Sequence, residues 1–177
     1  SSIVDSDADN NGYHGFGCSK AECTIKNSRS HNNARVGFAL NASKNSVVEN
    51  NFGSGNATGA GSYAPSELDY NSGNIIRGNR LIENREHGIE ISGRADSDQF
   101  ATRVEDNVLE GAGPNYAGIY ASDGSRHVIV GNEFIGTGRY GVHLNDVADA
   151  HVADNTIAPV GLGVLATATP GAPLGTN

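Results

Sequence analysis

The sequence contains no methionine and no tryptophan, and aromatic residues make up only 6% of its 177 residues. It also lacks a basic stretch. Only 12 Lys and Arg oppose 20 Asp and Glu, for a net charge of -8, so a nucleic acid is not an expected partner. No apolar run approaches the roughly 18 residues that span a bilayer, and no basic amphipathic helix is apparent. Membrane insertion is therefore excluded.

Cysteine is scarce as well. Cys18 and Cys23 are the only two, and their spacing matches no zinc-binding pattern. One small disulfide is one interpretation. A buried Cys18 with an unrelated Cys23 is the alternative, and it is favoured because free cysteine is commonly a small core residue.

Glycine and asparagine are abundant, with 24 glycines in the chain. Both residue types are poor helix formers and both tolerate left-handed turn conformations. The composition therefore disfavours a helical bundle and predicts many tight turns.

A motif with the pattern apolar-x-x-Asn-x-apolar recurs along the chain. Successive asparagines stand 23 to 29 residues apart, a period typical of a solenoid. The five copies begin, place their asparagine and end at Val47/Asn50/Phe52, Ile76/Asn79/Leu81, Val104/Asn107/Leu109, Ile129/Asn132/Phe134 and Val152/Asn155/Ile157.

A second repeat lies about a dozen residues upstream of most of these copies and begins with glycine. Its alternation of apolar and other residues predicts a short, half-buried strand. The copies begin at Gly15, Gly37, Gly88, Gly118 and Gly141, and the residues expected to point outward are Gly17, Ala39, Glu90, Tyr120 and His143.

These repeats predict an all-β fold, a right-handed, single-stranded parallel β-helix of about six rungs over residues 1–157. Residues 158–177 are expected to form a last partial rung and a tail rich in Pro, Gly, Ala and Thr. Few leucines and no helical segment in each repeat exclude a leucine-rich repeat. Stacked rungs bring equivalent residues about 4.8 Å apart, so the repeated asparagines are expected to form a hydrogen-bonded ladder.

The rungs resemble the pectate-lyase-like β-helix repeats of carbohydrate-active enzymes, and most closely the catalytic module of mannuronan C5-epimerases, over most of residues 11–159. That family's Tyr-Gly-Phe-Asp-Pro-His-Glu signature corresponds to residues 14–20, which read HGFGCSK. Gly15 and Phe16 match, whereas Gly17 and Ser19 replace the family's Asp and His, and Asn41 replaces a further active-site Asp. The resemblance implies the fold and a function on uronate polymers, and it carries over no catalytic residue.

Glu90, Tyr120 and His143 occupy equivalent outward positions on three consecutive rungs, so neighbouring members are expected about 5 Å apart. Abstraction of the C5 proton of a uronate requires a base, a proton donor and a cation that neutralises the carboxylate. His143 as the base, Tyr120 as the acid and Arg139 or Arg94 as the cation fit these roles.

Further residues beside this column are expected to bind substrate, namely His87, Tyr140 and Asn145. Two alternatives remain open. A hydrolase would pair Glu90 with Asp123 or Asp146, and a merely solvated polar face would have no catalytic role.

A metal site is a weaker hypothesis. Asp5, Asp7 and Asp9 alternate near the start of the chain and resemble the first half of a Ca²⁺-binding loop. Cys18 stands where such a loop needs its last carboxylate, so a solvated acidic turn is the alternative.

The sequence thus predicts a carbohydrate-active protein, secreted or at the cell surface, whose partner is an acidic polysaccharide. If it is an enzyme, a lyase or C5-epimerase type is expected. The competing class is a non-catalytic shaft, either adhesive or tailspike-like. The first rung's open edge would need cover from an oligomer partner or from a preceding segment.

Overall fold

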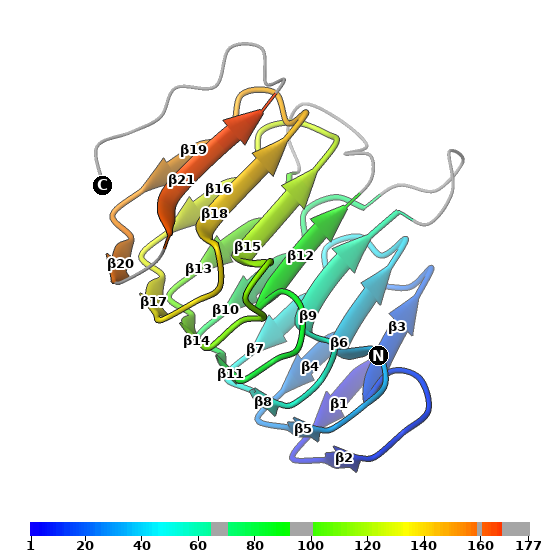
Figure 1. Cartoon of the computed structure of the whole chain (residues 1–177). Coiled ribbons are helices and arrows are strands. Elements are labelled where there is room, and N and C mark those ends of the chain that lie inside the picture. The colour runs from blue at the N-terminus through cyan, green and yellow to red at the C-terminus, as the bar shows by residue number, and fades with distance from the viewer. Residues whose placement is uncertain (65–70, 93–100, 159–160, 168–177) are drawn as a thin grey trace.

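The computed structural model describes residues 1–64, 71–92, 101–158 and 161–167. All regular structure in these residues is β-strand, arranged in three parallel sheets of seven strands each. The predicted parallel β-helix is confirmed, with seven rungs where the repeats suggested about six. Figure 1 shows the rungs stacked from the blue N-terminal end to the red C-terminal end. No helix in the described part is long and apolar enough to span a membrane.

Each rung contributes one strand to each sheet. Sheet A comprises β1 (Ser2–Val4), β4 (Thr24–Lys26), β7 (Val47–Glu49), β10 (Ile75–Arg77), β13 (Arg103–Glu105), β16 (Val128–Val130) and β19 (His151–Ala153). Sheet B comprises β2 (Asp7–Asp9), β5 (Arg29–His31), β8 (Phe52–Ser54), β11 (Arg80–Ile82), β14 (Val108–Glu110), β17 (Glu133–Ile135) and β20 (Thr156–Ala158). Sheet C comprises β3 (Phe16–Ser19), β6 (Val36–Asn41), β9 (Thr58–Tyr63), β12 (Ile89–Ser92), β15 (Ala117–Ser122), β18 (Tyr140–Asn145) and β21 (Leu162–Thr167).

The corner between sheets A and B is made in every rung by one residue with a positive φ. Asn, Asp and Gly tolerate this left-handed conformation better than other residues, which explains much of the unusual composition. The corner residues are Asp5, Asn27, Asn50, Gly78, Asp106, Gly131 and Asp154.

A ladder of buried asparagines runs along the inside of this corner. Asn79 is typical, because its backbone N–H and its side-chain amide both donate to Oδ1 of Asn107, at 3.0 and 2.9 Å. The ladder was predicted, but its first copy was assigned wrongly. Asn51 is the buried member, and its amide donates to Asn79, whereas the predicted Asn50 is the exposed corner residue with φ of 54°. Adjacent asparagines made the two roles indistinguishable in the repeat.

A second asparagine ladder, which the sequence analysis did not identify, lies at the corner between sheets B and C. The backbone N–H of Asn33 donates to Asn56 Oδ1 at 3.1 Å, and that of Asn56 donates to Asn84 Oδ1 at 3.2 Å. These bonds fix the turns that lead into β6, β9 and β12, and so hold the start of sheet C in place.

The core is a stack of apolar side chains that face inward from all three sheets, with Phe38, Ile91 and Phe134 among the fully buried members. Cys18 and Cys23 are both buried and are joined in a disulfide that links the end of β3 to the start of β4. The favoured interpretation of two unrelated cysteines was therefore wrong.

Candidate functional site

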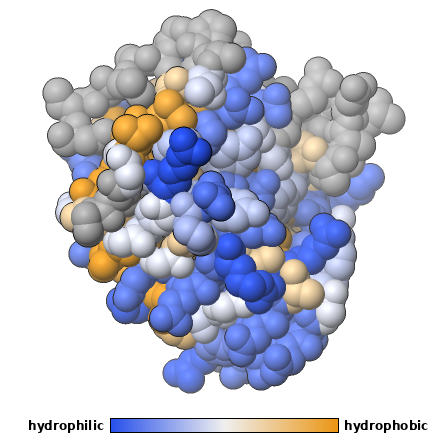
Figure 2. All heavy atoms as spheres, in the orientation of Figure 1, coloured by the Kyte–Doolittle hydropathy of each residue, from blue (hydrophilic) through white to orange (hydrophobic). Residues whose placement is uncertain are grey.

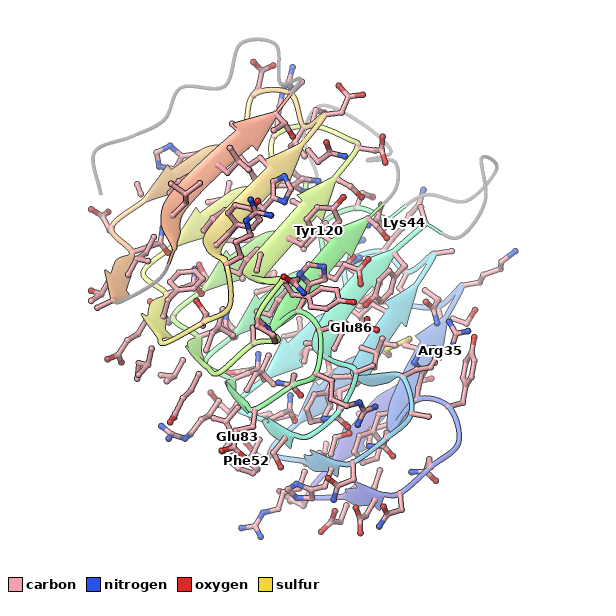
Figure 3. All side chains as sticks on the ribbon, viewed as in Figure 1. Arg35, Lys44, Phe52, Glu83, Glu86 and Tyr120 are labelled. Atoms are coloured by element: carbon pink, nitrogen blue, oxygen red, sulfur yellow. A yellow bond between two sulfur atoms is a disulfide. The ribbon has the colours of Figure 1, made fainter. Side chains whose placement is uncertain are left out.

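The predicted outward residues of sheet C form one continuous column. Glu90 of β12 is in register with Tyr120 of β15, which is in register with His143 of β18. We call these three residues the polar column. Towards the N-terminus, the same position is held by the small residues Gly61, Ala39 and Gly17. Sheet C faces the viewer in Figure 3, where Tyr120 is labelled.

Aromatic rings connect the polar column to the residues that precede the strands. His87 stacks on Tyr120, with ring centroids 4.8 Å apart and planes 11° from parallel. Tyr120 meets His143 edge-on at 5.2 Å, and His143 contacts Tyr140 at 4.9 Å. Arg139 places its guanidinium 5.2 Å from the centre of the Tyr140 ring. The predicted residues of this region are therefore brought together, with Arg139 and His143 on the same rung.

The two histidines of this cluster differ in what they can do. Nδ1 of His87 accepts a hydrogen bond from the backbone N–H of Ala117 at 3.1 Å, which leaves the proton on Nε2. Burial lowers the pKa of His87 to about 4, so its ring is a neutral donor at pH 7. Burial also lowers the pKa of His143, which makes no hydrogen bond with the described residues. His143 is therefore the neutral histidine whose ring nitrogens are available to accept a proton.

Glu90 has a partner that the sequence analysis missed. Tyr63, at the end of β9, donates its hydroxyl proton to Glu90 Oε2 at 3.4 Å. Burial raises the pKa of both groups, and the nearby Glu86 carboxylate raises each further. Gly61 allows this contact, because a Cβ at that position would lie 2.2 Å from the Tyr63 hydroxyl oxygen. The weak repeat pattern around β9 hid Tyr63 from sequence reasoning.

A groove of about 530 Å³ lies on the outer face of sheet C over its N-terminal rungs. We call it the sheet C groove. Its lining is mostly polar, and Glu90 is its only polar-column member, since Tyr120 and His143 lie on the next two rungs. The lining residues are Tyr13, His14, Ala34, Arg35, Val36, Asn41, Ala57, Thr58, Tyr63, Glu86, Glu90 and Ser92. Figure 2 shows this face as largely hydrophilic, with hydrophobic residues gathered towards the C-terminal rungs.

The remaining predicted residues are spread more widely. Asn145 donates its amide to the Tyr120 hydroxyl at 3.5 Å, so it reaches the polar column. Asp123 and Asp146 occupy left-handed corner positions after β15 and β18, off the strand face that carries Glu90. Arg94 lies outside the described residues.

The three N-terminal aspartates do not form a metal site in the described structure. Asp7 and Asp9 are two residues apart on the outer face of β2, roughly 7 Å along the strand, too far for one small ion to bridge comfortably. Asp9 instead accepts hydrogen bonds from Asn10 and Asn32, at 2.8 and 3.3 Å. Among the described residues, no group of three or more His, Cys, Asp or Glu side chains could hold a metal ion.

Comparison with known proteins gives one family match, to a family model described as periplasmic copper-binding protein (NosD), over residues 1–161. No curated protein matches the chain significantly.

Solved structures with this fold include the A-module of the mannuronan C-5 epimerase AlgE4 from Azotobacter vinelandii. It is 16% identical with a TM-score of 0.66, over 99% of this chain and 57% of that one. The periplasmic alginate epimerase AlgG is 14% identical with a TM-score of 0.53, over 95% of this chain and 50% of that one. An alginate lyase from Paenibacillus sp. str. FPU-7 is 14% identical with a TM-score of 0.50, over 94% of this chain and 79% of that one. The chain thus spans little more than half of the epimerase structures, and identities this low show the fold alone.

Proposed function

The chain belongs to the family of periplasmic copper-binding proteins (NosD), and from this premise we propose that it works on the outer side of the cytoplasmic membrane, where sheet C binds and acts on an acidic polysaccharide. The observation that carries the proposal is the in-register column of Glu90, Tyr120 and His143, which continues the line of an open polar groove. The titles of the epimerase and lyase structures, which name mannuronan and alginate, support a uronate polymer as the partner.

The proposed chemistry begins with His143, which accepts the C5 proton of a uronate. The electron pair left on C5 delocalises into the uronate carboxylate, whose negative charge the Arg139 guanidinium stabilises. Tyr120 then donates its proton. In a lyase the proton goes to the glycosidic oxygen as its bond to C4 breaks and a C4–C5 double bond forms. In an epimerase it goes to the opposite face of C5.

The neighbouring side chains hold these groups in place. Asn145 donates to the Tyr120 hydroxyl oxygen, so the tyrosine proton points away from the amide and is available for transfer. The stacked His87 ring presents its Nε2–H as a fixed donor, suited to a sugar hydroxyl. Tyr140, held beneath Arg139, offers an aromatic surface to a sugar ring.

A chain with a net charge of -8 would repel a polyanion in general, so local charge must favour binding. Arg139 supplies positive charge at the His143 end of the face. The raised pKa of Glu90 reduces the negative charge at the other end, since the carboxyl is protonated at a higher pH than usual. Added Ca²⁺ would further bridge the chain and a uronate polymer.

Copper binding, which the family description names, finds no support in the described residues. Cys18 and Cys23 are joined in a disulfide, and the rings of His87 and His143 lie on opposite sides of Tyr120. No group of three possible ligands comes together in that part of the chain. The residues present therefore do not fit a copper site, and we assign copper no step.

A second candidate function is glycan binding without catalysis. It is favoured by the position of the sheet C groove, which lies beside the polar column and contains only Glu90 from it. The two functions differ in turnover. The His143→Ala variant should bind glycan and lose turnover, whereas His151→Ala, an exposed histidine on sheet A, should keep both. Turnover that is unchanged in His143→Ala would overturn the proposed catalytic role.

A further inference from the structure

We propose that Arg35 and His14 form a carboxylate-binding subsite in the sheet C groove, which holds a second uronate of the same polymer at a distance from His143. This inference rests on the proposed function and extends it, since it says how an acidic chain is recognised away from the reacting sugar. It is independent of whether the polar column performs chemistry.

Arg35 is held in place and has no carboxylate partner among the described residues. It lies in the turn before β6, where its backbone N–H donates to the carbonyl of Tyr13 at 2.9 Å. Its guanidinium lies 5.0 Å from the centre of the Tyr13 ring. The other paired arginines differ, because Arg77 and Arg80 bind glutamates on sheets A and B. The positive charge of Arg35 is thus directed to the groove that it lines.

His14 adds a neutral donor beside this charge. Its Nδ1 accepts a hydrogen bond from the backbone N–H of Val36 at 3.3 Å, so the ring proton resides on Nε2. Burial and the nearby Arg35 both lower the pKa of His14, which keeps the ring uncharged at neutral pH. A planar guanidinium with an adjacent N–H donor suits a carboxylate, which accepts several hydrogen bonds in one plane.

The groove is electrically asymmetric along its length. Arg35 precedes β6 in the second rung, whereas Glu86 and Glu90 belong to the fourth rung, about 10 Å further along the axis. Figure 3 labels Arg35 and Glu86 at separate positions on this face. An anionic group is therefore attracted to the Arg35 end and repelled from the Glu86 end. This asymmetry selects a uronate with its carboxylate at Arg35 and favours one direction of the polymer in the groove.

A single cation between acidic neighbours also limits the ligand to weakly charged groups. A sugar carboxylate carries one negative charge, whereas a densely sulfated polymer would place further charges against Glu86 and Glu90. We therefore assign the subsite to carboxylated sugars.

The test is a titration of the whole chain with a mannuronate trimer and with the same trimer after reduction of its carboxyl groups to alcohols, followed by calorimetry or NMR shifts. Wild type should bind the acidic trimer at least tenfold more tightly than the reduced one. Arg35→Gln should remove this preference, and Arg35→Lys, which keeps the charge without the planar fork, should retain part of it. Arg29→Gln, an exposed arginine on sheet B of the same rung, should match wild type.

Equal binding of the two trimers by wild type, an Arg35→Gln variant that still prefers the acidic trimer, or no binding of either trimer would each overturn the subsite. Thermal melting shows whether each variant is folded. Failure of the proposed catalysis is distinguished separately, because a chain that prefers the acidic trimer but turns over no polymer keeps the subsite and loses the catalytic role.

Discussion

The His87 ring lies flat against the Tyr120 ring, with centroids 4.8 Å apart and an interplanar angle of 11°. His87 is itself fixed by the N–H of Ala117, the first residue of the strand that carries Tyr120. The two rings therefore brace each other across adjacent rungs. This contact holds the Tyr120 hydroxyl on the outer face of sheet C, between Glu90 and His143.

The Tyr120→Phe variant separates the hydroxyl from the stacking. Phenylalanine keeps the ring against His87, so substrate binding should change by less than about twofold, while turnover should fall by roughly 10² to 10⁴, as expected for loss of a general acid. Kinetics on a uronate polymer measure this split between KM and kcat. Tyr116→Phe is the matched control, because Tyr116 contacts His87 edge-on and lies outside the polar column. Equal turnover by Tyr120→Phe and wild type would remove Tyr120 from the mechanism.

The asparagine ladder predicts a large difference between two adjacent residues. Asn51→Ala removes the acceptor for the Ser28 N–H and the donor to the Ile25 carbonyl, all in the buried interior. Unsatisfied buried groups of this kind cost about 1–3 kcal/mol each, so the free energy of unfolding should fall by about 3 kcal/mol. Asn50→Gly should change it by less than about 0.5 kcal/mol, since glycine adopts the same positive φ. Urea denaturation of both variants measures the difference, and similar losses in the two would contradict the assigned register.

The repeats predicted the fold because each rung must bury the same small set of positions. Apolar residues such as Ile76 and Ile119 recur at these positions, and the outward column followed directly from their alternation. Asn50 and Asn51 show where this reasoning fails, since one residue type suits both a left-handed corner and a buried ladder. Tyr63 shows another limit. Its contact with Glu90 depends on the missing side chain at Gly61, a detail of side-chain packing that the repeat pattern does not contain.

His127 predicts a dependence of stability on pH. The ring is fully buried beside the backbone of Thr102 and Asp123, and burial lowers its pKa from the ordinary 6.5 to about 4. Between these two values the unfolded chain binds a proton that the folded chain excludes, so stability is full above pH 6.5 and falls as the pH drops towards 4. This one group should account for about 3 kcal/mol of the loss.

The His127→Thr variant tests this origin, because Thr102 holds the equivalent position one rung earlier. Urea denaturation at several pH values should show a shallower loss between pH 6.5 and 4 in the variant. Part of the slope should remain, since the pKa of His87 is also lowered to about 4. Identical slopes in wild type and variant would show that His127 is not the group responsible.

The disulfide between Cys18 and Cys23 should stabilise the first rungs. Closing a loop of about six residues lowers the entropy of the unfolded chain by an amount worth about 2 kcal/mol in the chain-entropy treatment. A reducing agent should therefore lower the denaturation midpoint of wild type. The Cys18→Ala/Cys23→Ala double variant should be less stable and insensitive to the reducing agent. A reductant effect of equal size in the double variant would show that the change arises elsewhere.

Proton NMR of polysaccharides during incubation with the whole chain tests the central claim most directly. Polymannuronate, pectate and neutral glycans are compared, each with and without Ca²⁺. Action on a uronate polymer by the polar column predicts new signals of unsaturated or epimerised uronate from an acidic polymer and none from the neutral glycans. Unchanged spectra for every polymer, or changes confined to the neutral glycans, would contradict the account.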